Sequence, residues 1–287
     1  MDRVITHLAA AITAATGQTP VSIRLLGGGL CDVYGVRLTD GTMIVAKRDN
    51  RAAPQLDVEA KMLDCLSRLS SLPVPAVIHS STDLLLMPFI EGGGNLTAAA
   101  EEHAADLLAG LHAVTAPAFG FDYDTLIGGL RQPNRRNTSW IDFFRDERLL
   151  SMGRTAVQSN RLPTLVFMRL ERLAESLNQF LTEPKSASLI HGDVWSGNVI
   201  VGKNKIAAFI DPAIYYADPE IELAFIGLFH TFSARFLRRY AEHRPIAEGF
   251  TETRAHIYNL YPLLVHVQLF GGSYVQTVGD TLKRFGF

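Results

Sequence analysis

The segment 188–201, "SLIHGDVWSGNVIV", holds an aspartate and an asparagine, Asp193 and Asn198, between two short apolar runs. A further carboxylate, Asp211, ends the apolar run that opens the segment 207–220, "AAFIDPAIYYADPE". If the apolar runs between Asn198 and Asp211 pair as a hairpin, the three side chains face one point. Two carboxylates and an amide carbonyl form a cage of oxygen ligands, which Mg²⁺ prefers, with water and phosphate oxygens completing its coordination. A carboxylate kept off the metal could instead accept a proton from a hydroxyl nucleophile.

The alternative is that these side chains only cap turns between strands, which is the usual role of Asp and Asn. The order His-x-Asp-x4-Asn, then a strand, then Asp, is however the order of catalytic and metal-binding residues in phosphotransferases. We therefore interpret the two segments as the centre of a phosphoryl-transfer site.

Composition excludes several other classes of function. The 287 residues carry a formal net charge of −2, without a basic stripe, which gives no electrostatic support for binding nucleic acid or an anionic membrane. No apolar run approaches the roughly 18–20 residues of a membrane span. The only cysteines are Cys31 and Cys65, which is no disulfide framework, so we expect a cytoplasmic protein.

Hydrophobic periodicity and turn residues indicate two regions. The N-terminal one is predicted to contain a helix that ends near Gly17, strands over 21–28, 33–40 and 42–49, a helix over 53–69, and strands over 74–81 and 83–90. The Asp40-Gly41 pair between two runs rich in β-branched residues indicates a hairpin. The other region is predicted to be mostly helical, with helices over 96–114, 138–154, 162–181 and 257–272.

The motif "HGDVWSGN" at 191–198, followed by "IDPAIYYADPEIELAF" at 210–225, closely resembles the fructosamine kinase (ketosamine-3-kinase) family. This family belongs to the larger group of aminoglycoside- and choline-kinase-like proteins related to protein kinases. The segments 119–134, 140–149 and 260–274 also look like segments of the family and occur in the expected order. The resemblance implies an α+β, bilobal protein-kinase-like fold, with a small N-terminal antiparallel sheet plus helices and a larger, mostly helical C-terminal lobe.

The resemblance also implies roles for the central residues. Asp193 would be the catalytic base, Asn198 and Asp211 would hold magnesium, and His191 would orient the loop. The family has Asp-Pro where protein kinases have Asp-Phe-Gly, and Asp211 is followed by a proline here as well.

In a fold of this kind the N-terminal lobe binds ATP. Lys47, on the third predicted strand, would pair with the α- and β-phosphates, and Glu59 on the following helix would hold the lysine by an ion pair. Gly27, Gly28 and Gly29 lie at the position in the chain where a phosphate-covering loop is expected. Glycine suits such a loop, because it lets backbone N–H groups approach phosphate oxygens closely. A lysine on a strand edge and a glycine-rich turn are common without such roles.

The adenine would bind the segment between the lobes. With Met87 as gatekeeper, the resemblance assigns the backbone C=O of Pro88 as acceptor and the N–H of Ile90 as donor. Proline lacks an N–H but keeps its C=O, so its presence at this position is compatible with that role.

The acceptor pocket would be lined from the helical lobe. The resemblance gives Trp195, Tyr216, His266 and Trp140 as candidates, together with the segment Gly271-Gly272-Ser273. The alternative for aromatic and His side chains on apolar helices is burial in the core.

Asp218 and Pro219 predict a helix start, with Asp218 as N-cap and Pro219 at the first helical position. Because only six residues separate Asp211 from Asp218, no long segment is available to hold a peptide substrate, so we expect a small-molecule acceptor. Glu222 replaces an Asp more usual in the family, and we interpret it as structural.

These observations predict two domains, a nucleotide-binding lobe over 1–91 and a helical lobe over 92–287 with the catalytic loop and acceptor site. The predicted activity is ATP- and Mg²⁺-dependent phosphorylation of a sugar hydroxyl on a ketosamine or other glycated amine. One alternative is a kinase of the same fold that acts on an aminoglycoside, choline or another amino-sugar. Another is a nucleotide-binding regulator without catalysis, although such a protein would be expected to lack Lys47, Asp193 or Asp211. The sequence leaves open the oligomeric state and any redox role of Cys31.

Overall fold

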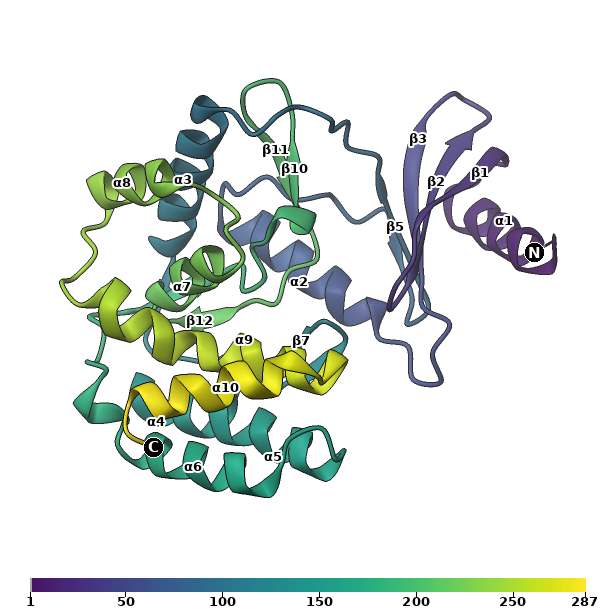
Figure 1. The fold of residues 1–287 in the computed structure, drawn as a ribbon. Coiled ribbons are helices and arrows are strands. Elements are labelled where there is room, and N and C mark those ends of the chain that lie inside the picture. The colour runs from purple at the N-terminus through teal and green to yellow at the C-terminus, as the bar shows by residue number, and fades with distance from the viewer. Residues whose placement is uncertain (1) are drawn as a thin grey trace.

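The computed structural model describes residues 2–287, which form a small sheet-containing lobe and a larger, mostly helical lobe (Figure 1). The small lobe begins with helix α1 (Asp2–Thr16), and helix α2 (Leu56–Leu69) lies between its third and fourth strands. Its antiparallel sheet has the strand order β1-β2-β3-β5-β4. The strands are β1 Pro20–Gly27, β2 Asp32–Leu38, β3 Met43–Arg48, β4 His79–Ser80 and β5 Leu84–Pro88.

The β2–β3 hairpin forms at the predicted Asp-Gly turn. Asp40 Oδ1 accepts a hydrogen bond from the Thr42 N–H at 2.8 Å, and Gly41 has a φ of +89°, which glycine adopts readily. The resulting register places Lys47 on β3 directly opposite Val33 on β2. The turn chemistry therefore fixes where Lys47 lies along the sheet.

The two faces of this sheet are covered by different helices. Leu8 and Ile12 of α1 pack against one face, in a cluster with Val36. Leu63 of α2 packs against the other face, in a cluster with Leu85. Because successive strand residues point to opposite faces, the apolar run of β5 serves both helices.

The region predicted as a strand over 74–81 is mostly irregular, and only His79–Ser80 pairs with β5. Pro75 lies in the irregular part, and proline has no N–H to donate to a ladder. The predicted strand is therefore wrong over most of its length.

The large lobe contains two short hairpins and a three-stranded sheet among its helices (Figure 1). Its strands are β6 Thr115–Ala116, β7 Thr125–Ile127, β8 Leu130–Gln132, β9 Ala187–Ile190, β10 Val199–Val201, β11 Ile206–Phe209 and β12 Tyr215–Ala217. Its α-helices are α3 Ala98–His112, α4 Trp140–Phe143, α5 Ser151–Gln158, α6 Thr164–Glu175, α7 Glu220–Leu228, α8 Ala234–His243, α9 Ala255–Phe270 and α10 Ser273–Arg284. Two π-helical turns precede α5 and α9, at Phe144–Leu150 and Phe250–Arg254.

The core of the large lobe is rich in aromatic side chains. Trp140 is fully buried, stacks on Phe143 with 5.8 Å between ring centroids, and donates its indole N–H to the hydroxyl of Tyr258 at 3.1 Å. Trp140 is thus a core residue and does not line an acceptor site. The alternative of core burial holds for this candidate.

Helix α7 begins at Glu220, one residue later than predicted, with Pro219 in the N-cap position. Asp218 nevertheless accepts a hydrogen bond from the Glu220 N–H through Oδ1 at 2.9 Å. The helix predicted over 138–154 is also interrupted, because its central part forms the π-helical turn Phe144–Leu150.

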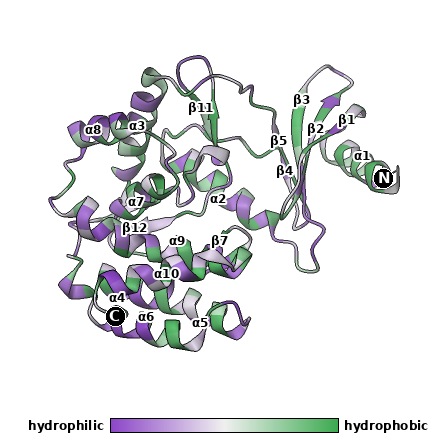
Figure 2. Cartoon of the chain, viewed as in Figure 1, coloured by the Kyte–Doolittle hydropathy of each residue, from purple (hydrophilic) through white to green (hydrophobic). Residues whose placement is uncertain are grey.

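Helix α8 buries Phe236 and Tyr240, and Figure 2 shows hydrophilic as well as hydrophobic residues along it. Among the residues that the structure describes, no helix has the length and apolar character needed to cross a membrane.

Candidate active site

The catalytic-loop candidate follows the buried strand β9, and its conformation depends on Gly192. This glycine has a φ of +85°, and a Cβ there would lie 2.2 Å from the carbonyl oxygen of Ala213. The Ala213 N–H in turn donates to the carbonyl of His191 at 2.7 Å. The loop that carries Asp193 is therefore held closely against the segment that follows Asp211.

The segment from Asn198 to Asp211 forms the predicted hairpin. Strands β10 and β11 pair antiparallel with Val199 opposite Phe209, and the Ile210 N–H donates to the carbonyl of Asn198 at 3.0 Å. The hairpin thereby returns Asp211 to the neighbourhood of Asn198.

Asn198 is buried and is bonded directly to Asp193. Its Nδ2 donates to the Asp193 carbonyl at 2.9 Å and to Asp193 Oδ2 at 2.8 Å. These bonds fix the orientation of the amide, so its Oδ1 faces away from the loop backbone. The second of these bonds also fixes the position of Oδ2 in the Asp193 carboxylate.

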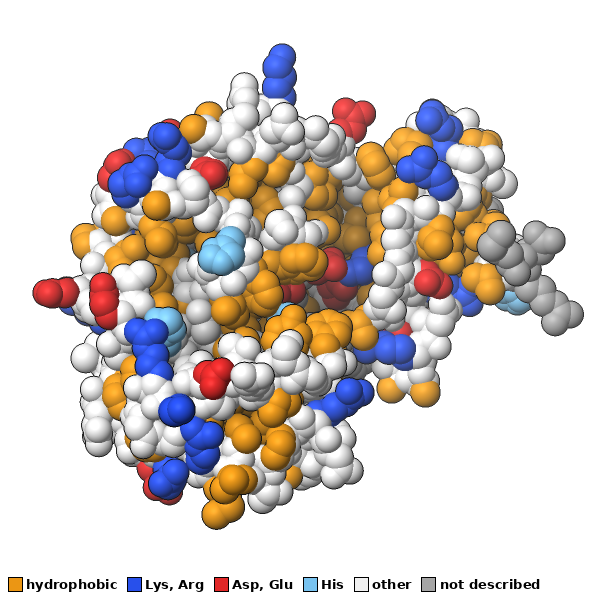
Figure 3. Space-filling model, in the orientation of Figure 1, with side chains coloured by type: hydrophobic (Ala, Val, Ile, Leu, Met, Phe, Trp, Pro, Cys, Tyr) orange, Lys and Arg blue, Asp and Glu red, His pale blue; other side chains and the backbone are white. Residues whose placement is uncertain are grey.

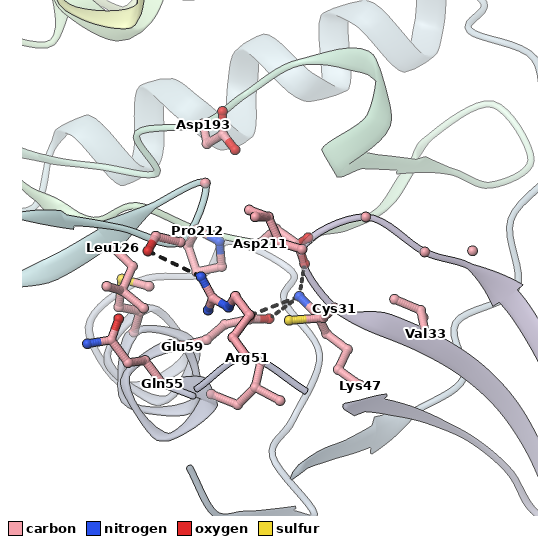
Figure 4. A pocket seen from close by; sticks show the side chains of 18 of the residues that line it. Cys31, Val33, Lys47, Arg51, Gln55, Glu59, Leu126, Asp193, Asp211 and Pro212 are labelled. Atoms are coloured by element: carbon pink, nitrogen blue, oxygen red, sulfur yellow. Dashed lines mark hydrogen bonds and ion pairs between the residues drawn. The ribbon is translucent and has the colours of Figure 1, made fainter. Parts of the chain in front are cut away.

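Asp211 joins this hairpin to the small lobe. Its φ is +54°, a conformation that is uncommon for residues other than glycine and is often found at functional sites. Oδ1 of Asp211 lies 2.9 Å from Nζ of Lys47, which also contacts both carboxylate oxygens of Glu59 at 2.8 Å (Figure 4). Burial lowers the pKa of Lys47, but Glu59 and Asp211 together outweigh it and raise the pKa above its usual value. The lysine is therefore a buried cation between the two lobes.

The surroundings of Asp193 raise the pKa of its carboxyl group. Burial, and then repulsion from the Asp211 carboxylate, raise the pKa of Asp193 from 3.8 to about 7, although the hydrogen bond from Asn198 acts in the opposite direction. A carboxylate with a pKa near the working pH is suited to general base catalysis. His191 is fully buried, which lowers its pKa, and its Nδ1 accepts the Asp193 N–H at 3.3 Å. It contacts the loop as an orienting residue would.

A buried network that the sequence did not indicate supports the same loop. Glu222 on α7 accepts the Gly192 N–H through Oε1 at 2.6 Å and contacts Nε2 of His112 through Oε2 at 2.8 Å. The other ring nitrogen of His112 lies 2.7 Å from the hydroxyl of Tyr240. Glu222 is structural, as predicted, but it acts directly on the catalytic loop.

Two adjoining cavities open between the lobes, and both include Lys47 and Asp211. A space-filling view shows the hollow there, with acidic and basic side chains at its floor (Figure 3). The larger cavity, of about 430 Å³, also includes Glu59, Asp193 and the glycine loop at Gly27, Gly28 and Gly29. The smaller one, of about 220 Å³, is lined mainly by apolar residues and includes Met87, Pro88 and Ile90.

The acceptor candidates are only partly brought to these cavities. Trp195 lines the larger cavity and is 42% exposed. Tyr216 lies on β12, stacked on Phe121, and is absent from the lining of both cavities, because its strand places it on the face toward Phe121. His266 is also absent from the lining, and its Nδ1 contacts the Pro262 carbonyl within α9 at 2.8 Å. Of the three, Trp195 is the residue that the structure places at the site.

The sequence interpretation also missed lining residues of the larger cavity. Arg51 and Gln55 enter it from the connection between β3 and α2, and Leu126, Gly128 and Gly129 enter it from the β7–β8 hairpin. A signal for this hairpin was present, because a Gly-Gly pair between short apolar runs is typical of a tight turn.

A family model, a relative and a solved structure that resemble this chain all carry the name of a fructosamine or ketoamine kinase. The sequence model of the family described as "Fructosamine kinase" matches residues 1–285. A protein of Synechocystis sp. named a probable ketoamine kinase is 33% identical over 96% of this chain and 95% of its own length. The crystal structure of a candidate fructosamine-3-kinase from Thermobifida fusca superimposes with a TM-score of 0.87 and 32% identity, covering 96% of this chain and 97% of the other.

More distant solved structures share the fold. The aminoglycoside phosphotransferase APH(4)-Ia, solved with AMP-PNP and hygromycin B, has a TM-score of 0.67 at 19% identity, with 98% of this chain and 99% of the other covered. The predicted α+β, bilobal kinase-like fold is thereby confirmed.

Proposed function

Because the chain belongs to the fructosamine kinase family, we propose that it transfers the γ-phosphoryl group of ATP to a sugar hydroxyl of a ketosamine. The observation that carries this proposal is that Asp193, Asp211 and Lys47 line one cleft, where Asn198 holds the Asp193 carboxylate from outside the lining. A nucleotide-binding regulator would not need Asp193, a carboxylate in this cleft besides the two that contact Lys47.

The two cavities match the parts of ATP. The smaller, apolar cavity beside Met87 would take the adenine, with the carbonyl of Pro88 and the N–H of Ile90 as its hydrogen-bond partners. The larger one, which contains Lys47 and the glycine loop, would take the phosphates. A buried lysine that keeps its charge can neutralise phosphate oxygens.

The donor set at the cleft fits magnesium. The described residues hold no cluster of three or more His, Cys, Asp or Glu side chains that could enclose a metal, so phosphate oxygens and water would complete the coordination. Asn198 Oδ1 and the Asp211 carboxylate would hold Mg²⁺, which would neutralise charge on the phosphates during transfer.

Asp193 would act on the acceptor. Its Oδ2 is held by Asn198, which leaves Oδ1 to accept the proton of the sugar hydroxyl. Trp195 would form one side of the acceptor site, because its exposed ring lines the same cavity as Asp193.

We further propose that the boundary between the two domains lies near residue 91 and that the protein is cytoplasmic. Both cysteines are free, which supports that location.

The test is a coupled ADP-release assay with the purified protein. The acceptors are ribulosamine, erythrulosamine and fructosamine derivatives, with choline and aminoglycosides as controls. We expect ADP release above the background ATPase rate only with ketosamines. Release with an aminoglycoside or choline alone would assign the site to the related kinases, and no release with any acceptor would contradict the proposal.

A further inference from the structure

Arg51 is a charged side chain in the active cleft to which the proposed mechanism gives no role. It lies on the connection between β3 and α2 and lines the cavity that contains Lys47, Asp193 and Asp211. Figure 4 shows its guanidinium pointing into this cavity from beside Glu59. Among the described residues that line the cavity, Lys47 and Arg51 are the basic ones.

A buried carboxylate orients Arg51. Asp49, whose side chain has no exposed surface, accepts hydrogen bonds from Nε of Arg51 at 2.9 Å and from its Nη2 at 2.6 Å. Asp49 also accepts the backbone N–H groups of Arg51 at 3.0 Å and of Gln55 at 3.4 Å. Two hydrogen bonds to one carboxylate fix the orientation of the guanidinium. The edge that carries Nη1 then points away from Asp49.

The other edge of the guanidinium is available for a ligand. Its Nη1 contacts the carbonyl of Gly129 on the β7–β8 hairpin at 3.5 Å, which is at the limit of a hydrogen bond. The side chain of Arg51 is 34% exposed although its anchor Asp49 is not. A weak contact of this kind is readily replaced by a stronger acceptor.

The charges of the cleft favour an anionic ligand at this edge. Lys47 lies between two carboxylates, those of Glu59 and Asp211, so its single positive charge is already shared. A nucleotide triphosphate adds further negative charge, part of which Mg²⁺ would neutralise. Among the described residues that line this cavity, Arg51 is the other cation, and the carboxylate that pairs with it, Asp49, lies outside the lining.

We propose that Arg51 is a further catalytic residue, which donates hydrogen bonds to the phosphoryl group during its transfer; this inference rests on the proposed phosphotransferase function. In that step the acceptor oxygen forms a bond to the γ-phosphorus while the bond from phosphorus to the bridging oxygen of ATP breaks. The hydroxyl proton passes to Asp193, and ADP leaves with the electron pair of the broken bond. Arg51 stays protonated and stabilises the charge on the phosphoryl oxygens.

The experiment compares Arg51→Gln and Arg51→Lys with the wild type. Arg136→Gln is the matched control, because the Arg136 side chain is also 34% exposed, pairs with an aspartate and donates to backbone carbonyls, but lies outside the lining of both cavities. We measure kcat with a ketosamine, the KM of acceptors with and without a carboxylate, and the Kd of Mg·ADP and Mg·AMP-PNP.

If Arg51 contacts the transferring group, Arg51→Gln should lower kcat by about 10²-fold. Arg51→Lys should recover part of the loss, because it keeps the charge but not the two-pronged geometry. Mg·ADP affinity and the Arg136→Gln control should each stay within about twofold of wild type.

Three results would overturn the inference. One is an unchanged kcat in Arg51→Gln. Another is a rise only in the KM of carboxylate-bearing acceptors, which would place the acceptor's carboxylate on Arg51. The last is an equal loss of Mg·ADP and Mg·AMP-PNP binding together with a lower Tm, which would give Arg51 a purely structural role.

The binding measurements keep this inference separate from the proposed function. If the wild type phosphorylates no acceptor, the proposed function fails. The role of Arg51 is then tested by the ratio of the Kd of Mg·ADP to the Kd of Mg·AMP-PNP, which measures the preference for the γ-phosphate. Arg51→Gln should then reduce that preference by about tenfold, as expected for a lost charge-assisted bond to the γ-phosphate. An unchanged preference would overturn the inference.

Discussion

Replacing Glu222 by alanine should detach the catalytic loop from the core of the large lobe. The Glu222 carboxylate is fully buried and is bonded to the Gly192 N–H at 2.6 Å and to His112 at 2.8 Å. A hydrogen bond to a charged group contributes about 1.5–3 kcal/mol, and removing one partner of a buried pair costs about 3–5 kcal/mol. We expect Glu222→Ala to lower the free energy of unfolding by about 3–5 kcal/mol for these reasons.

Glu222→Gln is the matched control for this variant. Its amide oxygen can still accept the Gly192 N–H, and its amide nitrogen can donate to Nε2 of His112 if the other ring nitrogen donates to Tyr240. Because both contacts can be kept, we expect a loss of only about 1 kcal/mol. Urea unfolding of both variants measures the difference.

The same variants test whether the network positions Asp193. Gly192 directly precedes Asp193, so the loss of its anchor should displace the carboxylate and lower kcat of Glu222→Ala by about 10²-fold, while Glu222→Gln keeps most activity. A Glu222→Ala variant with the same free energy of unfolding and the same kcat as the wild type would refute this reasoning. A large loss of stability with unchanged kcat, measured on the fraction that stays folded, would show that Glu222 supports the helices but not the loop.

Other residues give further predictions. Gly192→Ala should lower kcat strongly and leave far less folded protein, because its Cβ would lie 2.2 Å from the Ala213 carbonyl; activity near wild type in a steady-state assay would show that the loop can shift freely. Asp211→Asn should weaken Mg·ATP binding by at least about tenfold in calorimetry, while nucleotide binding without Mg²⁺ changes little, and equal affinities with Mg²⁺ would remove Asp211 from the metal site. Burial, and next the charge of Glu220, raise the pKa of Asp218 from 3.8 to about 6, so the ionised form is disfavoured in the fold. The stability that Asp218 contributes is therefore full below pH 4 and lost as the pH rises through about 6, by about 3 kcal/mol in total. In urea unfolding, the free energy of unfolding of the wild type minus that of Asp218→Asn should fall as the pH rises across this range. A difference that stays constant with pH would contradict the prediction.

The part of the site that could be predicted from sequence is held together by local structure. Asp193, Asn198 and Asp211 lie within one loop and one hairpin, so their spacing alone brings them together. Lys47 is positioned by a hairpin whose Asp-Gly turn is visible in the sequence. The contact of Lys47 with Asp211 spans the two lobes. Sequence spacing does not indicate that these residues face each other, and that expectation came from the resemblance to kinases.

The residues that were missed or misplaced depend on long-range packing. Glu222, His112 and Tyr240 come from three different helices, and no local pattern indicates that they touch. Tyr216 was assigned to the acceptor site, but which face of its short strand meets the cleft is decided by the pairing of β12 with β9. Arg51 lies in an irregular connection, where sequence gives no direction for a side chain.

The most direct test of the account is the turnover of Asp193→Ala on a ketosamine, measured together with its affinity for Mg·ATP. If Asp193 is the base that receives the hydroxyl proton, kcat should fall by about 10²–10⁴-fold, while nucleotide binding stays within about threefold of wild type. A variant that binds the nucleotide and still phosphorylates the ketosamine at nearly the wild-type rate would contradict the account.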